Sequence, residues 1–300
     1  MRRWCLVVGL LADPGGLPPA PTMQPPPGTD VFVAPLSVRG GTVTIGAPTN
    51  LTRRAGYDNQ PSFSPDGKQL YYTVVREGGP NGTTQADIFR IDLASGRSEP
   101  FITTPESEYS ATVTPGGREV SVIRVELDST QRLWAFPLGG GPPRVLVERI
   151  KPVGYQAWLD PTSVAAFVLG SPSTLQLLDL AAGRATVLLS NIGRALQKVP
   201  GRRAISVTQR VSETEWWIVQ VDPATAATTP IVRMPEKADY FVWLSDGSLL
   251  TAAGSRFLRY RPKVDPEWKV VATLEGISGI TRLAVNGKND RVAFVAEDPK

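Results

Sequence analysis

The sequence of 300 residues contains no histidine and a single cysteine, Cys5, and this excludes most familiar catalytic sites. Without histidine there is no Ser-His-Asp triad, no Cys-His pair and no imidazole ligand for a metal. A lone cysteine forms neither an intramolecular disulfide nor a cysteine-rich metal site. The segment Gly276-Ile-Ser-Gly-Ile280 lacks the final glycine of the Gly-x-Ser-x-Gly elbow that presents a nucleophilic serine. We therefore expect a protein that is not an enzyme.

Polar and aromatic side chains recur at one place in the sequence, at the start of a series of predicted hairpins. If these segments converge on a common channel, they form a hydrogen-bonding mouth, and Tyr and Arg are favoured anchors at protein interfaces. This predicts a site for a peptide or protein partner. The alternative, that these are ordinary channel residues satisfied by one another and by water, stays open. The candidates are Tyr57, Asp58, Asn59, Glu108, Tyr109, Tyr155, Arg194, Asp239, Tyr240 and Arg282.

A second hypothesis makes use of the carboxylates in this set. Asp58, Glu108 and Asp239 could hold one hard cation such as Ca²⁺ in the channel through their oxygens. The metal would then polarise an ester or stabilise an enolate, as in a lactonase- or lyase-like enzyme. No general base for such a reaction is evident, and outside this hypothesis we expect no cofactor.

The elements that position these residues are repeated hairpins, each with a tight polar turn between two alternating strands. The clearest copy spans residues 60–75, and its turn is Pro65-Asp-Gly67. The copies are spaced roughly 40–50 residues apart, the interval of four-stranded propeller blades. The weaker copies cover residues 111–125, 157–169, 198–208, 242–251 and 284–295.

The two ends of the repeat array complement each other. Predicted strands at 30–36 and 42–52 have no hairpin before them, and the last hairpin, 280–296, has no strands after it. We expect these ends to share one blade, which closes the ring and covers sheet edges that would otherwise be exposed. The predicted fold is all-β: a six-bladed propeller of four-stranded antiparallel blades, forming one domain over residues 29–300.

Composition narrows the class of partner. The 32 Lys and Arg against 28 Asp and Glu leave a net charge of only +4, and no basic stripe indicates nucleic-acid binding. Residues 1–28 combine a basic start, a short apolar run and a proline-rich segment, which predicts an export signal and a linker. No other stretch approaches the ~18 apolar residues of a membrane span. We expect a monomer in the periplasm or secreted, and a cytoplasmic protein if the signal prediction is wrong.

Two motifs resemble the TolB-type β-propellers, a WD-repeat-like group: Phe63-Ser-Pro-Asp-Gly-Lys68 and Asp92-Leu-Ala-Ser-Gly96. Weaker copies extend the resemblance over residues 30–296. It implies a six-bladed propeller, a fold common in exported bacterial proteins and often a platform for protein interaction. TolB carries an additional N-terminal domain, which we do not expect in this chain. Related propellers also cover prolyl-oligopeptidase-like peptidases, so a stand-alone relative of those is an alternative. A third hypothesis assigns partner binding to the outer strands or the loop 76–85.

Overall fold

The structure is a computed structural model that describes residues 28–78 and 84–297. These residues form strands and turns without a helix, and none of them belongs to a helix long and apolar enough to cross a membrane. The predicted export signal, within residues 1–27, and the centre of the loop 76–85 lie outside the described residues. The all-β class predicted from the sequence is confirmed for the part of the chain that the structure describes.

Four sheets each consist of four antiparallel strands that follow one another in chain order, as the short turns between them require. The first two sheets are β8 (Ser107–Val113), β9 (Glu119–Val125), β10 (Gln131–Pro137) and β11 (Arg144–Val145), then β12 (Val153–Asp160), β13 (Ser163–Val168), β14 (Thr174–Asp179) and β15 (Arg184–Ser190). The next two are β16 (Ile192–Lys198), β17 (Ile205–Arg210), β18 (Trp216–Val221) and β19 (Thr228–Arg233), then β20 (Phe241–Trp243), β21 (Leu249–Ala253), β22 (Arg256–Tyr260) and β23 (Lys269–Thr273).

The other strands form one mixed sheet of nine, which differs from the separate antiparallel sheets that the sequence predicted. A single parallel pair, Thr29 beside Tyr57, joins its two halves, because the chain enters β1 next to the start of β4. The first half is β4 (Tyr57–Phe63), β5 (Gln69–Arg76), β6 (Gln85–Asp92) and β7 (Ser98–Ile102). The second half is β1 (Thr29–Arg39), β2 (Thr42–Ile45), β3 (Thr49–Asn50), β24 (Thr281–Val285) and β25 (Arg291–Glu297).

Strands from opposite ends of the chain lie side by side in that second half. β1 pairs antiparallel with β25 from Thr29 opposite Glu297 to Pro35 opposite Arg291. Phe32 stacks on Phe294 with ring centroids 5.3 Å apart, and Phe294 meets the edge of Phe257 from β22 at the same distance. One fully buried ring therefore connects the first described strand, the last strand and the neighbouring sheet.

The far end of β1 continues beyond β25 and pairs with β2. Leu36 and Val43 of this hairpin are buried in the same apolar cluster as Leu250 and Phe257 of the sheet β20–β23. Arg259 also donates from its guanidinium to the carbonyl of Gly41 in the turn between β1 and β2. The hairpin therefore packs against the adjacent sheet, through contacts that the sequence repeats did not predict.

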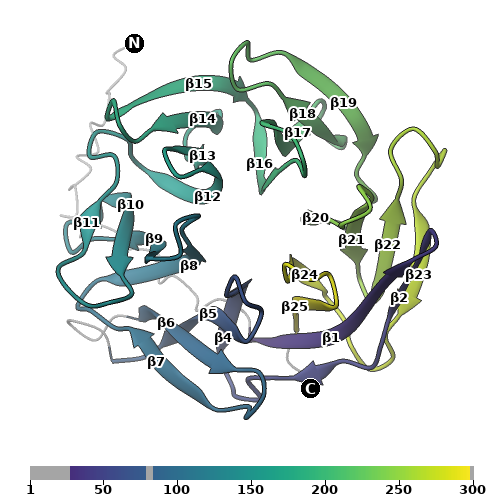
Figure 1. Cartoon of the computed structure of the whole chain (residues 1–300), viewed down its shortest axis with the longest axis horizontal. Helices are drawn as coiled ribbons and strands as arrows, with labels where there is room; N and C mark the ends of the chain where they lie inside the picture. Colours follow the sequence, from purple (N-terminus) through teal and green to yellow (C-terminus); the bar gives the residue numbers. More distant parts are fainter. Residues whose placement is uncertain (1–27, 79–83, 298–300) are drawn as a thin grey trace, which may run out of the picture.

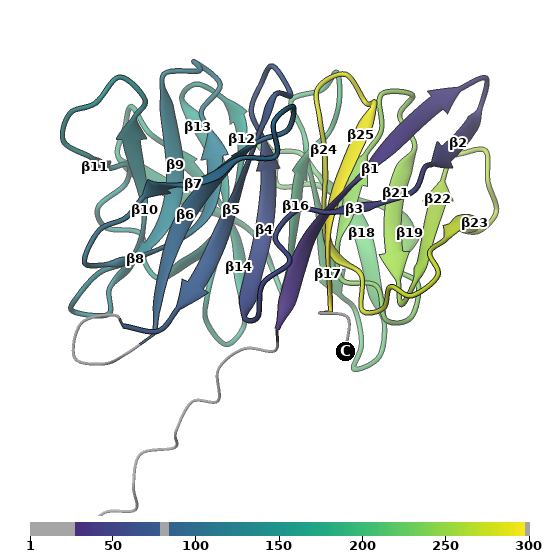
Figure 2. The same cartoon turned by 90° about the horizontal axis from the view of Figure 1, so that it is seen from below.

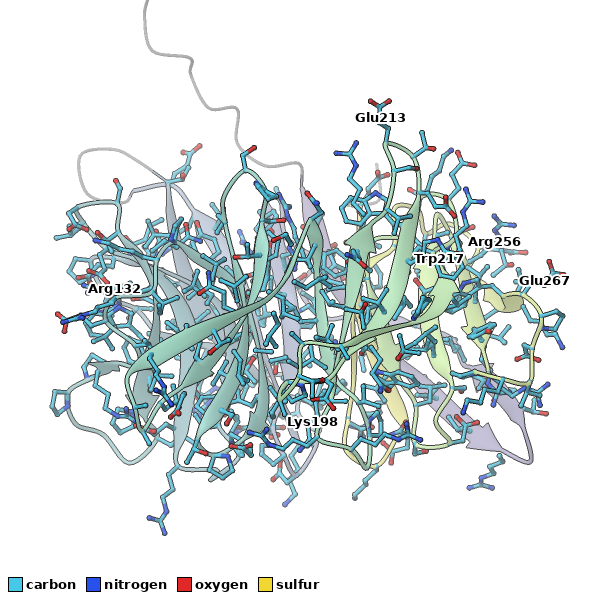
Figure 3. All side chains as sticks on the ribbon, turned by 90° about the horizontal axis from the view of Figure 1, so that it is seen from above. Arg132, Lys198, Glu213, Trp217, Arg256 and Glu267 are labelled. Atoms are coloured by element: carbon cyan, nitrogen blue, oxygen red, sulfur yellow. The ribbon has the colours of Figure 1, made fainter. Side chains whose placement is uncertain are left out.

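The sheets are arranged around a centre, with β4, β8, β12, β16, β20 and β24 nearest to it (Figure 1). Seen from the side, the strands run between the two faces of a flat body (Figure 2). The apolar core lies between neighbouring sheets: Ile123 and Leu133 of one sheet share a cluster with Val164 and Leu178 of the next. Charged side chains such as Glu213 project from the surface (Figure 3).

Repeated side-chain contacts fix neighbouring sheets and turns. Trp158 donates from its indole to Ser121 Oγ at 2.9 Å, and Trp243 donates to Ser206 Oγ at 2.8 Å, each across to the second strand of the preceding sheet. A buried indole N–H needs such an acceptor. In the turn after β6, Asp92 Oδ1 accepts hydrogen bonds from the backbone N–H groups of Ala94 and Ser95, at 3.1 and 2.8 Å.

Candidate functional site

Backbone bulges on the inner strands turn side chains toward the centre. The pairing shifts between residues 59 and 62 on β4, 109 and 112 on β8, and 281 and 284 on β24. At each bulge a non-glycine residue has a positive φ: 58° at Gln60, 55° at Ser110 and 50° at Arg282. A bulge re-aims the side chain that it carries, and non-glycine residues are kept in this conformation only where their surroundings hold them.

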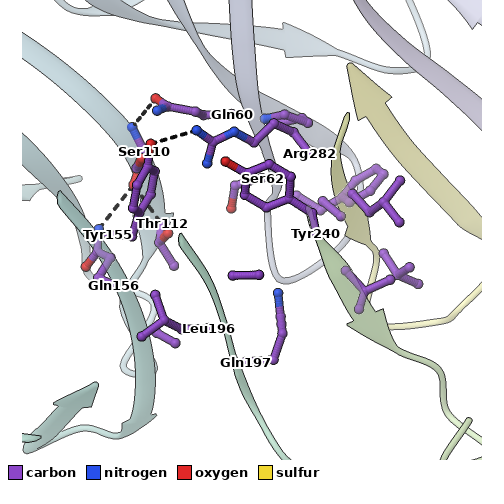
Figure 4. A pocket seen from close by; sticks show the side chains of 18 of the residues that line it. Gln60, Ser62, Ser110, Thr112, Tyr155, Gln156, Leu196, Gln197, Tyr240 and Arg282 are labelled. Carbon is purple, nitrogen blue, oxygen red and sulfur yellow. Dashed lines mark hydrogen bonds between the residues drawn. The ribbon is translucent and has the colours of Figure 1, made fainter. Parts of the chain in front are cut away.

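A cavity of about 470 Å³ lies where these inner strands converge (Figure 4). Its wall combines partly buried aromatic rings, among them Phe63, Trp158 and Trp243, with hydroxyl and amide side chains. The labelled lining residues are Gln60, Ser62, Ser110, Thr112, Tyr155, Gln156, Leu196, Gln197, Tyr240 and Arg282.

Arg282 lies between two tyrosine rings at the floor of this cavity. Its guanidinium carbon is 4.2 Å from the ring centroid of Tyr240 and 4.6 Å from that of Tyr155. One of its terminal nitrogens donates to the Tyr155 hydroxyl at 2.7 Å. Burial raises the pKa of the Tyr240 phenol well above its usual value, so this hydroxyl stays neutral at physiological pH.

Hydrogen bonds between inner strands hold the other side of the cavity. Gln60 Oε1 accepts from the backbone N–H of Ser110 at 2.9 Å and from Thr73 Oγ1 at 2.8 Å. Gln156 Nε2 donates to the Ser110 carbonyl at 3.1 Å. This leaves Ser110 Oγ and Gln156 Oε1 buried without a hydrogen-bond partner in the described chain. Both groups can accept a hydrogen bond, and Ser110 can also donate one.

Two smaller cavities adjoin the first near the starts of the inner strands. One, of about 330 Å³, is lined by Tyr57, Tyr109 and Tyr155, and the other, of about 290 Å³, by Asp239 and Tyr240. Arg194 lines all three cavities. The predicted residues Tyr155, Arg194, Tyr240 and Arg282 are therefore brought together around the centre.

Asp58 and Glu108 lie away from the cavities, because each is buried against an arginine. Asp58 Oδ1 accepts two bonds from Arg54, at 2.6 and 2.9 Å. Glu108 Oε1 accepts from Arg124 Nε at 3.0 Å and from Thr104 Oγ1 at 2.6 Å. Burial raises the pKa of Asp58 to about 6 and that of Glu108 to about 7, although the arginines oppose the shift.

The structure does not gather the three carboxylates of the metal hypothesis. Asp58 and Glu108 are held by their arginines, and Asp239 is exposed and lines another cavity. Within residues 28–78 and 84–297, no group of three or more acidic, cysteine or histidine side chains is placed to hold a metal ion. Asn59, also predicted at the mouth, is buried, and its Oδ1 accepts from the backbone N–H of Gln60.

The sequence argument placed the site at the strand starts, whereas the cavity of about 470 Å³ begins at the bulge and continues toward the turns. Ser62, Thr112, Gln197 and Lys198 were therefore not among the predicted site residues. A signal for part of this wall was present, since polar residues alternate along two inner strands, as they do where one face of a strand meets water. The alternating residues are Gln60 and Ser62 on β4, followed by Ser64 just after it, and Ser110 and Thr112 on β8, followed by Thr114 just after it.

No protein-family model and no curated protein matches the sequence. Solved structures do resemble it. A protein assigned as TolB from Agrobacterium tumefaciens is 15% identical, with a TM-score of 0.70, and the match covers 91% of this chain and 99% of that one. TolB from Acinetobacter baumannii is 12% identical, with a TM-score of 0.56, over 90% of this chain and 64% of that one.

An oligogalacturonate lyase, solved in complex with manganese, is 14% identical, with a TM-score of 0.56. That match covers 84% of this chain and 80% of the lyase. Identities this low show a shared fold and leave function to be argued from the site. The described part of the chain therefore has the β-propeller fold of the TolB proteins.

Proposed function

We propose that the chain is a six-bladed propeller, closed by β1 alongside β25, and that it is a non-catalytic module which binds a peptide or protein in its central cavity. The inner strands β4, β8, β12, β16, β20 and β24 surround the centre (Figure 1). The antiparallel pairing of β1 with β25 supports the closure. The ring matters for function because the cavity wall draws on β4, β8, β12, β16, β20 and β24 together.

The observation that carries the proposal is the composition of the central cavity. Its aromatic rings offer apolar area at little cost in side-chain entropy, which suits anchors for a partner. Ser110 Oγ and Gln156 Oε1 are buried there without partners in the described chain, and such groups are costly unless something bonds them. A peptide supplies both the N–H and C=O groups that would satisfy these atoms.

A metal-dependent lyase is the second candidate, favoured by the likeness to oligogalacturonate lyase in complex with manganese. The carboxylates at the centre of this chain do not converge in the described residues, so we give this candidate the lower rank. Calorimetric titration with Ca²⁺ and Mn²⁺ separates the two. The binding module gives no saturable heat, whereas stoichiometric binding that is lost in Asp239→Asn would establish a metal site.

Location and oligomeric state complete the proposal. The basic start and apolar run of residues 1–12 support export to the periplasm or to the medium. A closed ring leaves few unpaired edges for self-association, which supports a monomer.

Affinity capture from an envelope extract tests the proposed function, with the wild type compared with Tyr240→Ala. Tyr240 lines the cavity, so its truncation is expected to reduce the yield of the captured partner at least tenfold, the loss typical of an interface anchor at about 1.4 kcal/mol or more. Tyr260→Ala is the matched control. Tyr260 is the last residue of β22, lies outside the cavity and is buried against Trp268. Equal capture by both variants would contradict a cavity-bound partner.

A further inference from the structure

The charge that lines the central cavity is unbalanced. Among the residues that the structure describes, Arg194, Lys198 and Arg282 line it, and no aspartate or glutamate does. None of the three forms an ion pair with a described residue. Elsewhere the chain pairs its buried arginines, as with Arg124 on Glu108 and Arg259 on Asp246. The centre therefore gathers three cations that no ion pair within the described residues neutralises.

The setting of Arg282 favours an anion that approaches in the plane of its guanidinium. The ring centroids of Tyr155 and Tyr240 lie 4.6 and 4.2 Å from its guanidinium carbon, so both rings pack against the group. Its only side-chain hydrogen bond in the described chain goes to the Tyr155 hydroxyl. The remaining N–H groups point outward from the edge of the group, and a carboxylate can accept two of them side by side.

The other two cations extend this feature along the cavity. Arg194 is exposed, makes no side-chain hydrogen bond to a described residue, and lines all three cavities. Lys198 also lines the first cavity and is exposed, and its ammonium donates to the Leu159 carbonyl. The attraction between these cations and a negative charge is stronger in the cavity than in open water, because the walls lower the local dielectric constant.

The size and wall of the cavity distinguish among anions. A volume of about 470 Å³ is far larger than an inorganic ion needs, and rings such as Trp158 and Trp243 leave apolar surface beside the cations. A peptide that carries a carboxylate uses both features, since its chain fills the volume beside these rings while its charge meets Arg282.

We infer that the central cavity binds a peptide segment through a carboxylate, held by Arg282 and Arg194. This inference rests on the proposed function, and it adds the chemical class of the partner. The carboxylate can come from a Glu or Asp side chain or from a free C-terminus. Both sources offer the same planar acceptor pair to the guanidinium.

Calorimetric titration with short synthetic peptides tests the inference at low and at 0.5 M salt. The probes are tetraglutamate and tetraglutamine, both acetylated and amidated, together with acetylated tetraglutamine that keeps a free C-terminus. We expect the tetraglutamate, the free C-terminus or both to bind at least about tenfold more tightly than the neutral peptide, since hydrogen bonds between charged groups are stronger than those between neutral ones. The preference should weaken at high salt.

Variants assign the effect to named residues. Arg194→Gln and Arg282→Gln should each abolish the tenfold preference, and Arg282→Lys should recover part of it by restoring charge without the planar fork. Arg256→Gln, on the outer part of the sheet (Figure 3), is the matched control and should keep the preference. Thermal unfolding verifies that each variant is folded. If the Arg282 variants do not fold, Arg194→Gln alone tests the inference.

Three outcomes would overturn the inference. One is equal affinity for charged and neutral peptides, another is a preference unchanged in Arg194→Gln and Arg282→Gln, and the third is inorganic phosphate that binds as tightly as tetraglutamate. If capture still depends on Tyr240 while charged and neutral peptides bind alike, the proposed function stands and the carboxylate selection is wrong. If capture is independent of Tyr240, the proposed function fails as well.

Discussion

Truncation of Phe294 tests the packing of the two chain ends against each other. Phe294 is fully buried on β25, stacks on Phe32 of β1 with an interplanar angle of 7°, and contacts the edge of Phe257. Phe294→Ala should lower the free energy of unfolding by about 3–5 kcal/mol, the loss typical of a buried phenylalanine. The stacked pair itself should account for about 0.5–1.5 kcal/mol of this loss.

A double-mutant cycle in guanidinium chloride isolates that pair. Phe32→Ala, Phe294→Ala and the double variant should show a coupling free energy of about 0.5–1.5 kcal/mol between residues from opposite ends of the chain. The matched cycle of Phe32→Ala with Phe101→Ala, a partly buried ring on β7, should be additive within about 0.5 kcal/mol. Additivity of Phe32 and Phe294 would refute the side-by-side placement of β1 and β25.

Three further predictions concern pH, the β1–β2 hairpin and a turn. Burial raises the pKa of Glu108 from 4.5 to about 7, so the folded state holds more protons between these values and stability falls as pH rises through them. Urea unfolding at pH 4.5 and at pH 8 measures this loss of stability, and Glu108→Gln should reduce the loss by on the order of 3 kcal/mol. The control Glu267→Gln replaces an exposed glutamate and should leave the loss unchanged. If Glu108→Gln loses as much stability between the two pH values as Glu267→Gln does, the assignment to Glu108 is refuted. Leu36→Ala should cost about 2–5 kcal/mol, because Leu36 is buried against the adjacent sheet, and a loss below about 1 kcal/mol would place the hairpin elsewhere. Gly67→Ala should cost about 1 kcal/mol in the same assay, because φ is 70° and the added Cβ would lie 3.1 Å from Asn286 Nδ2, and unchanged stability would contradict this turn geometry.

Local patterns predicted the elements of this fold well. The turn at Pro65-Asp-Gly67 and the alternation that follows it have one structural solution, a hairpin with one apolar face, and the structure has β4 and β5 there. The repeats likewise predicted four-stranded antiparallel sheets, because each copy is a local unit. The pairing of the chain ends followed from counting unpaired strands, and β1 does lie beside β25.

Features that depend on distant residues were not predictable in the same way. The contact of the β1–β2 hairpin with β20–β23 joins segments with no shared motif. The arginine partners of Asp58 and Glu108 decide whether those carboxylates face the channel, and a single sequence does not state such pairings. A bulge shifts the facing of every later residue on its strand by one position, so the site moved from the strand starts toward Gln60, Ser110 and Arg282.

The most direct test of the account is a site-specific photocrosslink inside the cavity. p-Benzoylphenylalanine in place of Gln197, on the cavity wall, should crosslink the captured partner, and the crosslink should be lost on addition of Tyr240→Ala. The same group in place of Val187, exposed on the outer strand β15, should give no crosslink. Crosslinking at Val187 but not at Gln197 would place the partner on the outer surface and contradict a binding site in the central cavity.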